Sequence, residues 1–84
     1  MSYAVSILRS AQKSLGSLPS DLQDRLITAI GRLGTNPRPS GVKKLSGREA
    51  WRIRVADYRV IYEISDANLT VLVVDVGHRR EIYR

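Results

Sequence analysis

The sequence predicts an α+β protein in which a helical hairpin packs on a small, mostly antiparallel β-sheet. Apolar residues recur at helical spacing between residues 10 and 34, and at every second position between residues 51 and 64. The Pro- and Gly-rich segment 36–41 separates these two patterns. We therefore expect the element order β-α-α-β-β-β in one domain that covers residues 1–84.

The N-terminal part of the sequence predicts one strand and two helices. An apolar run over residues 3–8 predicts the strand, and residues 10–16 predict a short helix that stops at its glycine. A second helix begins at Pro19, since proline is tolerated in the first turn, and Gly34 is its expected C-cap. Because few residues separate the two helices, we expect them to form an antiparallel hairpin.

Residues 51–64 predict a β-hairpin with a two-residue turn at Ala56-Asp57. The register then pairs Val55 with Tyr58, Arg54 with Arg59, Ile53 with Val60, and Trp51 with Tyr62. The apolar pairs form one face, while the arginine pair and Arg52 share the other. A four-residue loop is the alternative; it would keep the faces but make Arg54 and Arg59 diagonal neighbours.

The rest of the chain predicts one long strand and a short one. Residues 66–68 have the composition of a turn, and residues 69–76 are apolar on both faces, as in a central strand covered on both sides. We expect Gly77 to break this strand and residues 81–83 to add a short last one.

Charge and composition narrow the function. The 84 residues carry a net charge of +6, and 11 of the 14 basic residues are arginines, whose planar fork of donors suits phosphate. A polyanionic partner is the first expectation; a surface kept soluble by charge is the alternative. The absence of cysteine and the single histidine argue against thiol chemistry and a catalytic metal centre. No apolar run is long enough to span a bilayer, and we expect no cofactor.

The hairpin arginines are the main candidate for an anion site. Guanidinium groups directly opposite each other on a sheet repel, and a bound phosphate would turn this repulsion into attraction. The alternative is an ordinary solvated face, partly neutralised by Glu63. Three more basic residues lead into the hairpin and are expected to extend this positive surface, where they would contact a polyanion such as RNA: Lys43, Lys44 and Arg48.

The C-terminal segment is a second basic patch. It contains a histidine, two arginines and a tyrosine that could stack on an unpaired base: His78, Arg79, Arg80 and Tyr83. We expect Arg80 to contact RNA. The simpler explanations are a surface histidine and a tyrosine ring that packs on its own sheet.

Four segments in order are similar to one known family. They are Asn-Pro-Arg-Pro-Ser-Gly-Val-Lys-Lys-Leu-Ser-Gly (36–47), Trp-Arg-Ile-Arg-Val (51–55), Asp-Tyr-Arg-Val-Ile-Tyr-Glu-Ile (57–64) and Val-Gly-His-Arg-Arg-Glu-Ile-Tyr (76–83). With these segments at this spacing, the chain resembles the RelE branch of the RelE/ParE toxin superfamily almost from end to end. The resemblance implies the same β-α-α-β-β-β fold.

The resemblance also implies a function. Toxins of the RelE branch cleave mRNA in the ribosomal A site, where the RNA's own 2′-hydroxyl attacks the adjacent phosphate without a metal ion. A cognate antitoxin blocks them. The implied protein is a cytoplasmic endoribonuclease that inhibits translation, with the ribosome, mRNA and an antitoxin as its partners.

The family's active-site positions match Arg52, Arg54, Arg59, Arg79 and Tyr83. By this resemblance Arg59 would hold the scissile phosphate, Arg79 would assist the leaving oxygen, and Tyr83 would stack on a base. The best-known members have lysine at the first two positions. Because arginine stays protonated, Arg52 and Arg54 would be poor proton acceptors. His78 is a candidate general base, since histidine changes its protonation state near neutral pH.

Two other functions remain open. A ParE-like toxin shares the fold but inhibits DNA gyrase and cuts nothing; this branch does not need the arginine set, which favours the RelE branch. A non-catalytic RNA-binding module is the other alternative.

Overall fold

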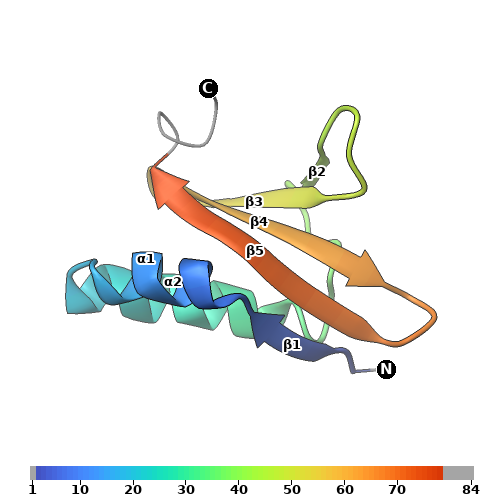
Figure 1. Ribbon diagram of the computed structural model, residues 1–84, viewed down its shortest axis with the longest axis horizontal. Helices are drawn as coiled ribbons and strands as arrows, with labels where there is room; N and C mark the ends of the chain where they lie inside the picture. The colour runs from blue at the N-terminus through green and yellow to red at the C-terminus, as the bar shows by residue number, and fades with distance from the viewer. Residues whose placement is uncertain (1, 79–84) are drawn as a thin grey trace.

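Alternating apolar residues in the C-terminal half and helical stripes in the N-terminal half produce a two-layer structure. The computed structural model describes residues 2–78. In chain order its elements are β1 (Ala4–Ile7), α1 (Arg9–Gly16), α2 (Ser20–Arg32), β2 (Lys43–Lys44), β3 (Trp51–Val55), β4 (Tyr58–Ser65) and β5 (Thr70–His78). Both helices lie against one face of the sheet (Figure 1). This arrangement confirms the predicted α+β class.

The sheet has five strands in the order β1-β5-β4-β3-β2. β1 pairs with β5 in parallel, and the other neighbouring strands are antiparallel. Parallel strands need a long connection that returns the chain to the same end of the sheet. Between β1 and β5 this connection consists of the two helices and the antiparallel strands that follow them. β4 is the middle strand, so its residues have a neighbour on both sides.

The two helices run in opposite directions beneath the sheet, as predicted (Figure 1). The buried side chains on their apolar stripes are Ala11, Leu15, Leu26 and Ile30. They meet the buried residues on the inner faces of β3, β4 and β5, which are Ile53, Val60, Tyr62, Val71, Val73 and Val76. Burial of these apolar side chains is the main source of stability for the fold.

Gly34 has a different role from the predicted one. α2 ends at Arg32 and its C-cap is Leu33, so the prediction of Gly34 as the cap was wrong. Instead, the carbonyl oxygen of Gly34 accepts a 2.6 Å hydrogen bond from the backbone N–H of Tyr3. A Cβ at Gly34 would lie 3.0 Å from the carbonyl oxygen of Tyr3 and 3.3 Å from Cγ2 of Val5. The glycine therefore allows the start of β1 to pack closely on the end of the helical hairpin.

The predicted hairpin register is confirmed. Val55 pairs with Tyr58 and Arg54 with Arg59, which requires the two-residue turn. The turn residue Ala56 has φ of 55°. Left-handed backbone at the first turn position matches the twist of two-residue hairpins, and Ala56 adopts it without the usual asparagine or glycine.

β5 differs from its prediction in three ways. It continues through Gly77 to His78, because both residues pair with β4, so Gly77 does not break the strand. Val74 is an extra residue in a bulge, since Ile61 pairs with Asp75 and Tyr62 with Val73. Within residues 2–78, no helix lies on the outer face, so β5 is not covered on both sides there. The predicted strand at 81–83 lies outside the described residues.

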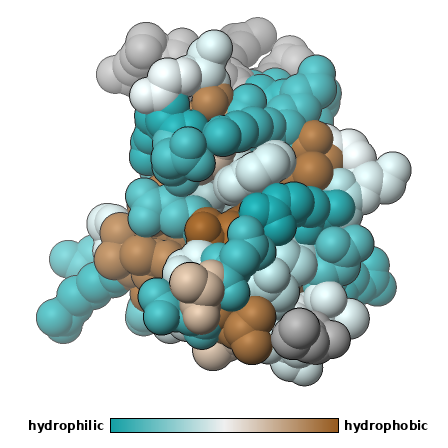
Figure 2. Space-filling model, turned by 90° about the vertical axis from the view of Figure 1, so that its right-hand side faces the viewer, coloured by the Kyte–Doolittle hydropathy of each residue, from teal (hydrophilic) through white to brown (hydrophobic). Residues whose placement is uncertain are grey.

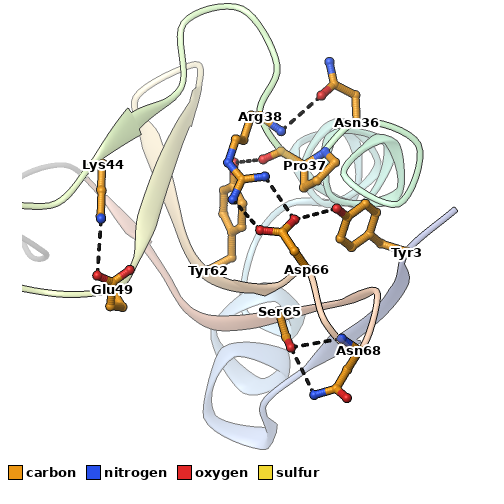
Figure 3. A network of polar contacts seen from close by, with 10 residues as sticks. All are labelled: Tyr3, Asn36, Pro37, Arg38, Lys44, Glu49, Tyr62, Ser65, Asp66 and Asn68. Carbon is orange, nitrogen blue, oxygen red and sulfur yellow. Dashed lines mark hydrogen bonds and ion pairs between the residues drawn. The ribbon is translucent and has the colours of Figure 1, made fainter. Parts of the chain in front are cut away.

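A polar network joins three segments that are far apart in the sequence (Figure 3). The guanidinium of Arg38 donates to both carboxylate oxygens of Asp66, at 3.2 and 2.9 Å, and the hydroxyl of Tyr3 donates to the same carboxylate at 2.6 Å. Hydrogen bonds from Arg38 and then Tyr3 lower the pKa of Asp66 to about 2. The network ties β1, the connection after α2 and the β4–β5 turn together.

The surface shows hydrophobic patches that hydrophilic side chains separate, at the end of the molecule seen in Figure 2. Among residues 2–78, no helix has both the length and the apolar character needed to cross a membrane.

Candidate nucleic-acid interface

The outer face of the sheet carries the predicted arginine cluster. Side chains of successive strand residues alternate between faces, so Arg52, Arg54 and Arg59 lie on the face opposite the helices. Arg54 and Arg59 are direct cross-strand partners. We call this outer face, defined by the three arginines, the arginine face.

Lys43 adds a fourth positive charge to the arginine face. It pairs with Arg52 through β2, a two-residue strand that the sequence did not predict. Two carboxylates share the face farther along the sheet, Glu63 and Asp75. Four cationic groups against two anionic ones give this face a net positive charge, which favours a polyanionic ligand.

The three arginines differ in how firmly they are held. Arg54 is exposed, and its Nε donates a 3.2 Å hydrogen bond to the carbonyl oxygen of Ala56 in the turn. Arg52 is partly buried, and so is Arg59, whose Nε atom is fully buried. Burial restricts the side chain of Arg59, so its guanidinium is the best positioned of the three to fix a phosphate. Opposite Arg59 on β5 is Gly77, which leaves space beside it.

His78 lies on the other face of the sheet. It pairs with Tyr58, and the two rings touch edge to face, with centroids 5.6 Å apart and planes at 83°. Because Tyr58 alternates with Arg59, its side chain is on the helix face. The structure therefore does not bring His78 together with the hairpin arginines.

The other predicted RNA-binding residues are spread out. Lys44 pairs with Trp51 on the helix side, with its Nζ 3.3 Å from a carboxylate oxygen of Glu49 and 5.8 Å from the ring centroid of Trp51. Arg48 is exposed in the β2–β3 loop and lines a pocket of about 400 Å³ with Glu49 and Glu63. Lys43 lies on the arginine face through its pairing with Arg52, and Arg48 borders the same face through the pocket that it shares with Glu63.

Several predicted site residues lie outside the described part of the chain: Arg79, Arg80 and Tyr83. Within residues 2–78, no group of three or more His, Cys, Asp or Glu side chains is placed to hold a metal ion. The chemistry that the described arginine face offers is phosphate binding and stabilisation of negative charge.

A family model described as the ParE toxin of the type II toxin–antitoxin system matches residues 5–83. The chain belongs to the RelE/ParE superfamily of type II toxins. Toxin RelG from Mycobacterium tuberculosis is 32% identical over 88 residues, which cover all of this chain and 99% of RelG. The relationship therefore extends over the whole sequence of the toxin.

Solved structures show the same fold. The RelE–RelB complex of the archaeon Pyrococcus horikoshii matches the toxin with a TM-score of 0.84 and 30% identity, covering 94% of this chain and 97% of the other. The RelBE2 toxin–antitoxin complex of M. tuberculosis matches with a TM-score of 0.81 and 28% identity, covering 94% and 100%. These matches confirm the resemblance to the RelE branch.

Proposed function

We propose that this toxin is a ribosome-dependent mRNA endoribonuclease. The observation that carries the proposal is the direct pairing of Arg54 with Arg59 on a face that also holds Arg52 and Lys43. Four cations on one side of a small sheet repel one another, and an RNA phosphate among them would offset this repulsion. The relationship to RelE toxins supplies the reaction.

In the proposed reaction, the 2′-oxygen of the RNA attacks the adjacent phosphorus and the bond to the 5′-oxygen breaks. The products are a 2′,3′-cyclic phosphate and a 5′-hydroxyl end. Arg59 holds the scissile phosphate and stabilises its developing charge, while Arg52 and Arg54 bind neighbouring phosphate oxygens. Arg79 assists the leaving 5′-oxygen and Tyr83 stacks on a base, as in the RelE branch.

The proton of the 2′-hydroxyl needs an acceptor. The arginines stay protonated and cannot accept it. His78 lies on the opposite face of the sheet beside Tyr58, so its side chain would have to move around the end of β5 to reach the hydroxyl. Asp75 is a carboxylate on the arginine face, in the same cross-strand row as Arg52 and Ile61. Cleavage rates of His78→Ala and Asp75→Asn identify the acceptor, since loss of a general base slows cleavage about 100-fold or more.

Dependence on the ribosome follows from this small set of groups. The arginine face can bind and polarise a phosphate, but it has little with which to place the 2′-oxygen in line with the leaving oxygen. Correct placement of reacting atoms contributes several kcal/mol to catalysis. We propose that the ribosomal A site supplies this placement, which puts the toxin in the cytoplasm with translating ribosomes.

The proposal is tested by adding the toxin to a translating extract and mapping mRNA 5′ ends. We expect cuts at one fixed position within codons, and none when ribosomes are left out. Cuts that ignore the reading frame, or cleavage of free RNA at the same rate, contradict the proposal.

The match to a ParE family model supports a second candidate, inhibition of DNA gyrase. A supercoiling assay beside the extract separates the two. Lost supercoiling without mRNA cuts assigns the toxin to the ParE branch. If neither effect appears, the third candidate, a non-catalytic RNA-binding module, remains.

We also propose a cognate antitoxin as the stable partner. The P. horikoshii and M. tuberculosis relatives were solved as toxin–antitoxin complexes. The positive arginine face favours a partner with an acidic segment that covers it. Co-purification with the protein encoded beside the toxin tests this, and cleavage in the extract should stop when that protein is added.

A further inference from the structure

A small polar pocket lies beside the arginine face, at the end of the sheet where β5 ends. Its volume is about 150 Å³. Ser14 and Ser17 line it from the C-terminal end of α1, Tyr58 lines it from the start of β4, and Gly77 and His78 line it from the end of β5. Val76 of the core and Leu18 form its apolar base, while the serine hydroxyls and the two rings give it polar and aromatic walls.

The aromatic side of this pocket suits a flat ring. Tyr58 and His78 meet edge to face at 83°, so they form a corner. A planar ligand that stacks on one of these rings meets the edge of the other, which is a favourable aromatic arrangement. Stacking on aromatic side chains is also how proteins hold unpaired bases.

The hydroxyl side of the pocket favours hydrogen-bond donors. Oγ of Ser17 donates to the carbonyl oxygen of Ser14 at 2.8 Å, and Oγ of Ser14 donates to the carbonyl oxygen of Ser10 at 3.2 Å. Each hydroxyl has one proton and two lone pairs. Since backbone carbonyls take both protons, the lone pairs are left to accept hydrogen bonds from a ligand.

The pocket lies one cross-strand pair away from Arg59, at the end of the sheet. Tyr58 directly precedes Arg59, and the Tyr58–His78 pair is the next pair after Arg59–Gly77. One strand residue advances about 3.4 Å and turns the side chain to the other face. Gly77 puts no side chain between the two places, so a single strand of RNA can bend past it.

We propose that this pocket binds one unpaired nucleobase that carries an exocyclic amino group, next to the phosphate held by Arg59. Adenine, cytosine and guanine have such an amino donor, whereas uracil has carbonyl oxygens in the corresponding places. The pocket would thus set the base preference of the toxin. This inference rests on the proposed binding of RNA by the arginine face.

Trinucleotides with 2′-deoxyribose, which lack the attacking hydroxyl, test the pocket without cleavage. Four of them, differing only in the middle base, are titrated into the wild-type toxin while backbone amides are followed by NMR. We expect the Ser17 and His78 amides to shift, and an amino-bearing middle base to bind about fivefold tighter than uracil, as for one added hydrogen bond. Deoxyribose 5-phosphate, which has no base, should leave the pocket amides unmoved.

Two variants make the test specific. Ser17→Ala removes one acceptor and should remove most of the preference over uracil, whereas Ser6→Ala, an exposed serine on β1, should keep it. Tyr58→Leu should weaken binding of every middle base, because it removes the stacking surface. Equal affinity for all four trinucleotides in the wild type, or unmoved pocket amides, overturns the inference.

The outcomes separate this inference from the proposed function. If amides on the arginine face shift and those of the pocket do not, the pocket inference fails alone. If the pocket binds bases as expected but no mRNA is cut in the extract, only the proposed cleavage fails.

Discussion

Arg59 differs from the other two arginines of the arginine face because it comes from β4, the middle strand of the sheet. Arg54 lies on one side of it and Gly77 on the other. A partly buried guanidinium in this position is held before the ligand arrives, so less side-chain entropy is lost on binding. The role of Arg59 should therefore be large and specific to its geometry.

We expect Arg59→Ala to lower mRNA cleavage about 100-fold or more, because it removes the main stabiliser of the charge on the phosphate. Arg59→Lys should retain part of the activity, since it keeps the charge and loses the planar fork. Cleavage rates in the translating extract measure both. Arg9→Ala, at the exposed start of α1, is the matched control and should cleave like the wild type.

Tyr62 makes a buried polar contact that the sequence did not indicate. Its side chain is 0% exposed, and its hydroxyl donates a 2.7 Å hydrogen bond to the carbonyl oxygen of Pro37. Burial raises the pKa of Tyr62 to about 12, from its ordinary value of 10.0. The fold therefore disfavours the phenolate.

This raised pKa predicts how stability depends on pH. The contribution of Tyr62 is fully present below pH 10.0 and is lost as pH rises toward about 12, because the unfolded chain ionises first. Tyr62→Phe should cost about 1–3 kcal/mol at pH 7, since it leaves the Pro37 carbonyl without this donor. Urea unfolding of Tyr62→Phe and the wild type at pH 7 and at about pH 12 checks this. If the difference in their free energies of unfolding is the same at both pH values, the prediction is contradicted.

Among the elements, the β3–β4 hairpin was predictable down to its register. Its apolar and basic residues alternate without interruption, so a one-residue shift would move the arginines into the core. The two helices were predictable for the same reason, since each has one apolar stripe. Gly77 was misjudged because a glycine breaks a strand only where the backbone must turn, and here it stays paired.

β2 and the β5 bulge could not be predicted from the sequence. Lys43 and Lys44 carry no apolar alternation, and they form a strand because the loop before β3 folds back along Trp51 and Arg52. The bulge at Val74 arises from the pairing register between β5 and β4, and no residue near Val74 in the sequence indicates it. Consequently, the face on which Lys43 and Asp75 lie became clear only from the structure.

Gly34 offers a test of how β1 packs on the helical hairpin. Gly34→Ala should destabilise the toxin by about 1–3 kcal/mol, because the new methyl group would crowd the Tyr3 carbonyl oxygen at 3.0 Å. Gly31→Ala is the matched control, since nothing lies within 4 Å of its Cβ position and alanine favours the helix. Urea unfolding measures the change in the free energy of unfolding for both variants. A Gly34→Ala variant as stable as Gly31→Ala contradicts the proposed close packing.

In the molecule as a whole, the two sides of the sheet differ in how their charged side chains are arranged. The helix side has ion pairs at Arg38–Asp66 and Lys44–Glu49, while the outer side gathers Arg52, Arg54 and Arg59. The net charge of +6 predicted a polyanionic partner but could not say where it binds. Only the strand register shows which basic residues lie together on the outer face, and which, like Lys44, point to the other side of the sheet.

The salt dependence of RNA binding tests most directly whether these arginines bind phosphates. Each phosphate contact to single-stranded RNA adds about −0.7 to the slope of log K against log salt. We therefore expect Arg52→Ala, Arg54→Ala and Arg59→Ala each to make the slope shallower by about 0.7, and Arg9→Ala to leave it unchanged. If all three arginine variants keep the wild-type slope, as Arg9→Ala should, the arginine face does not bind RNA phosphates.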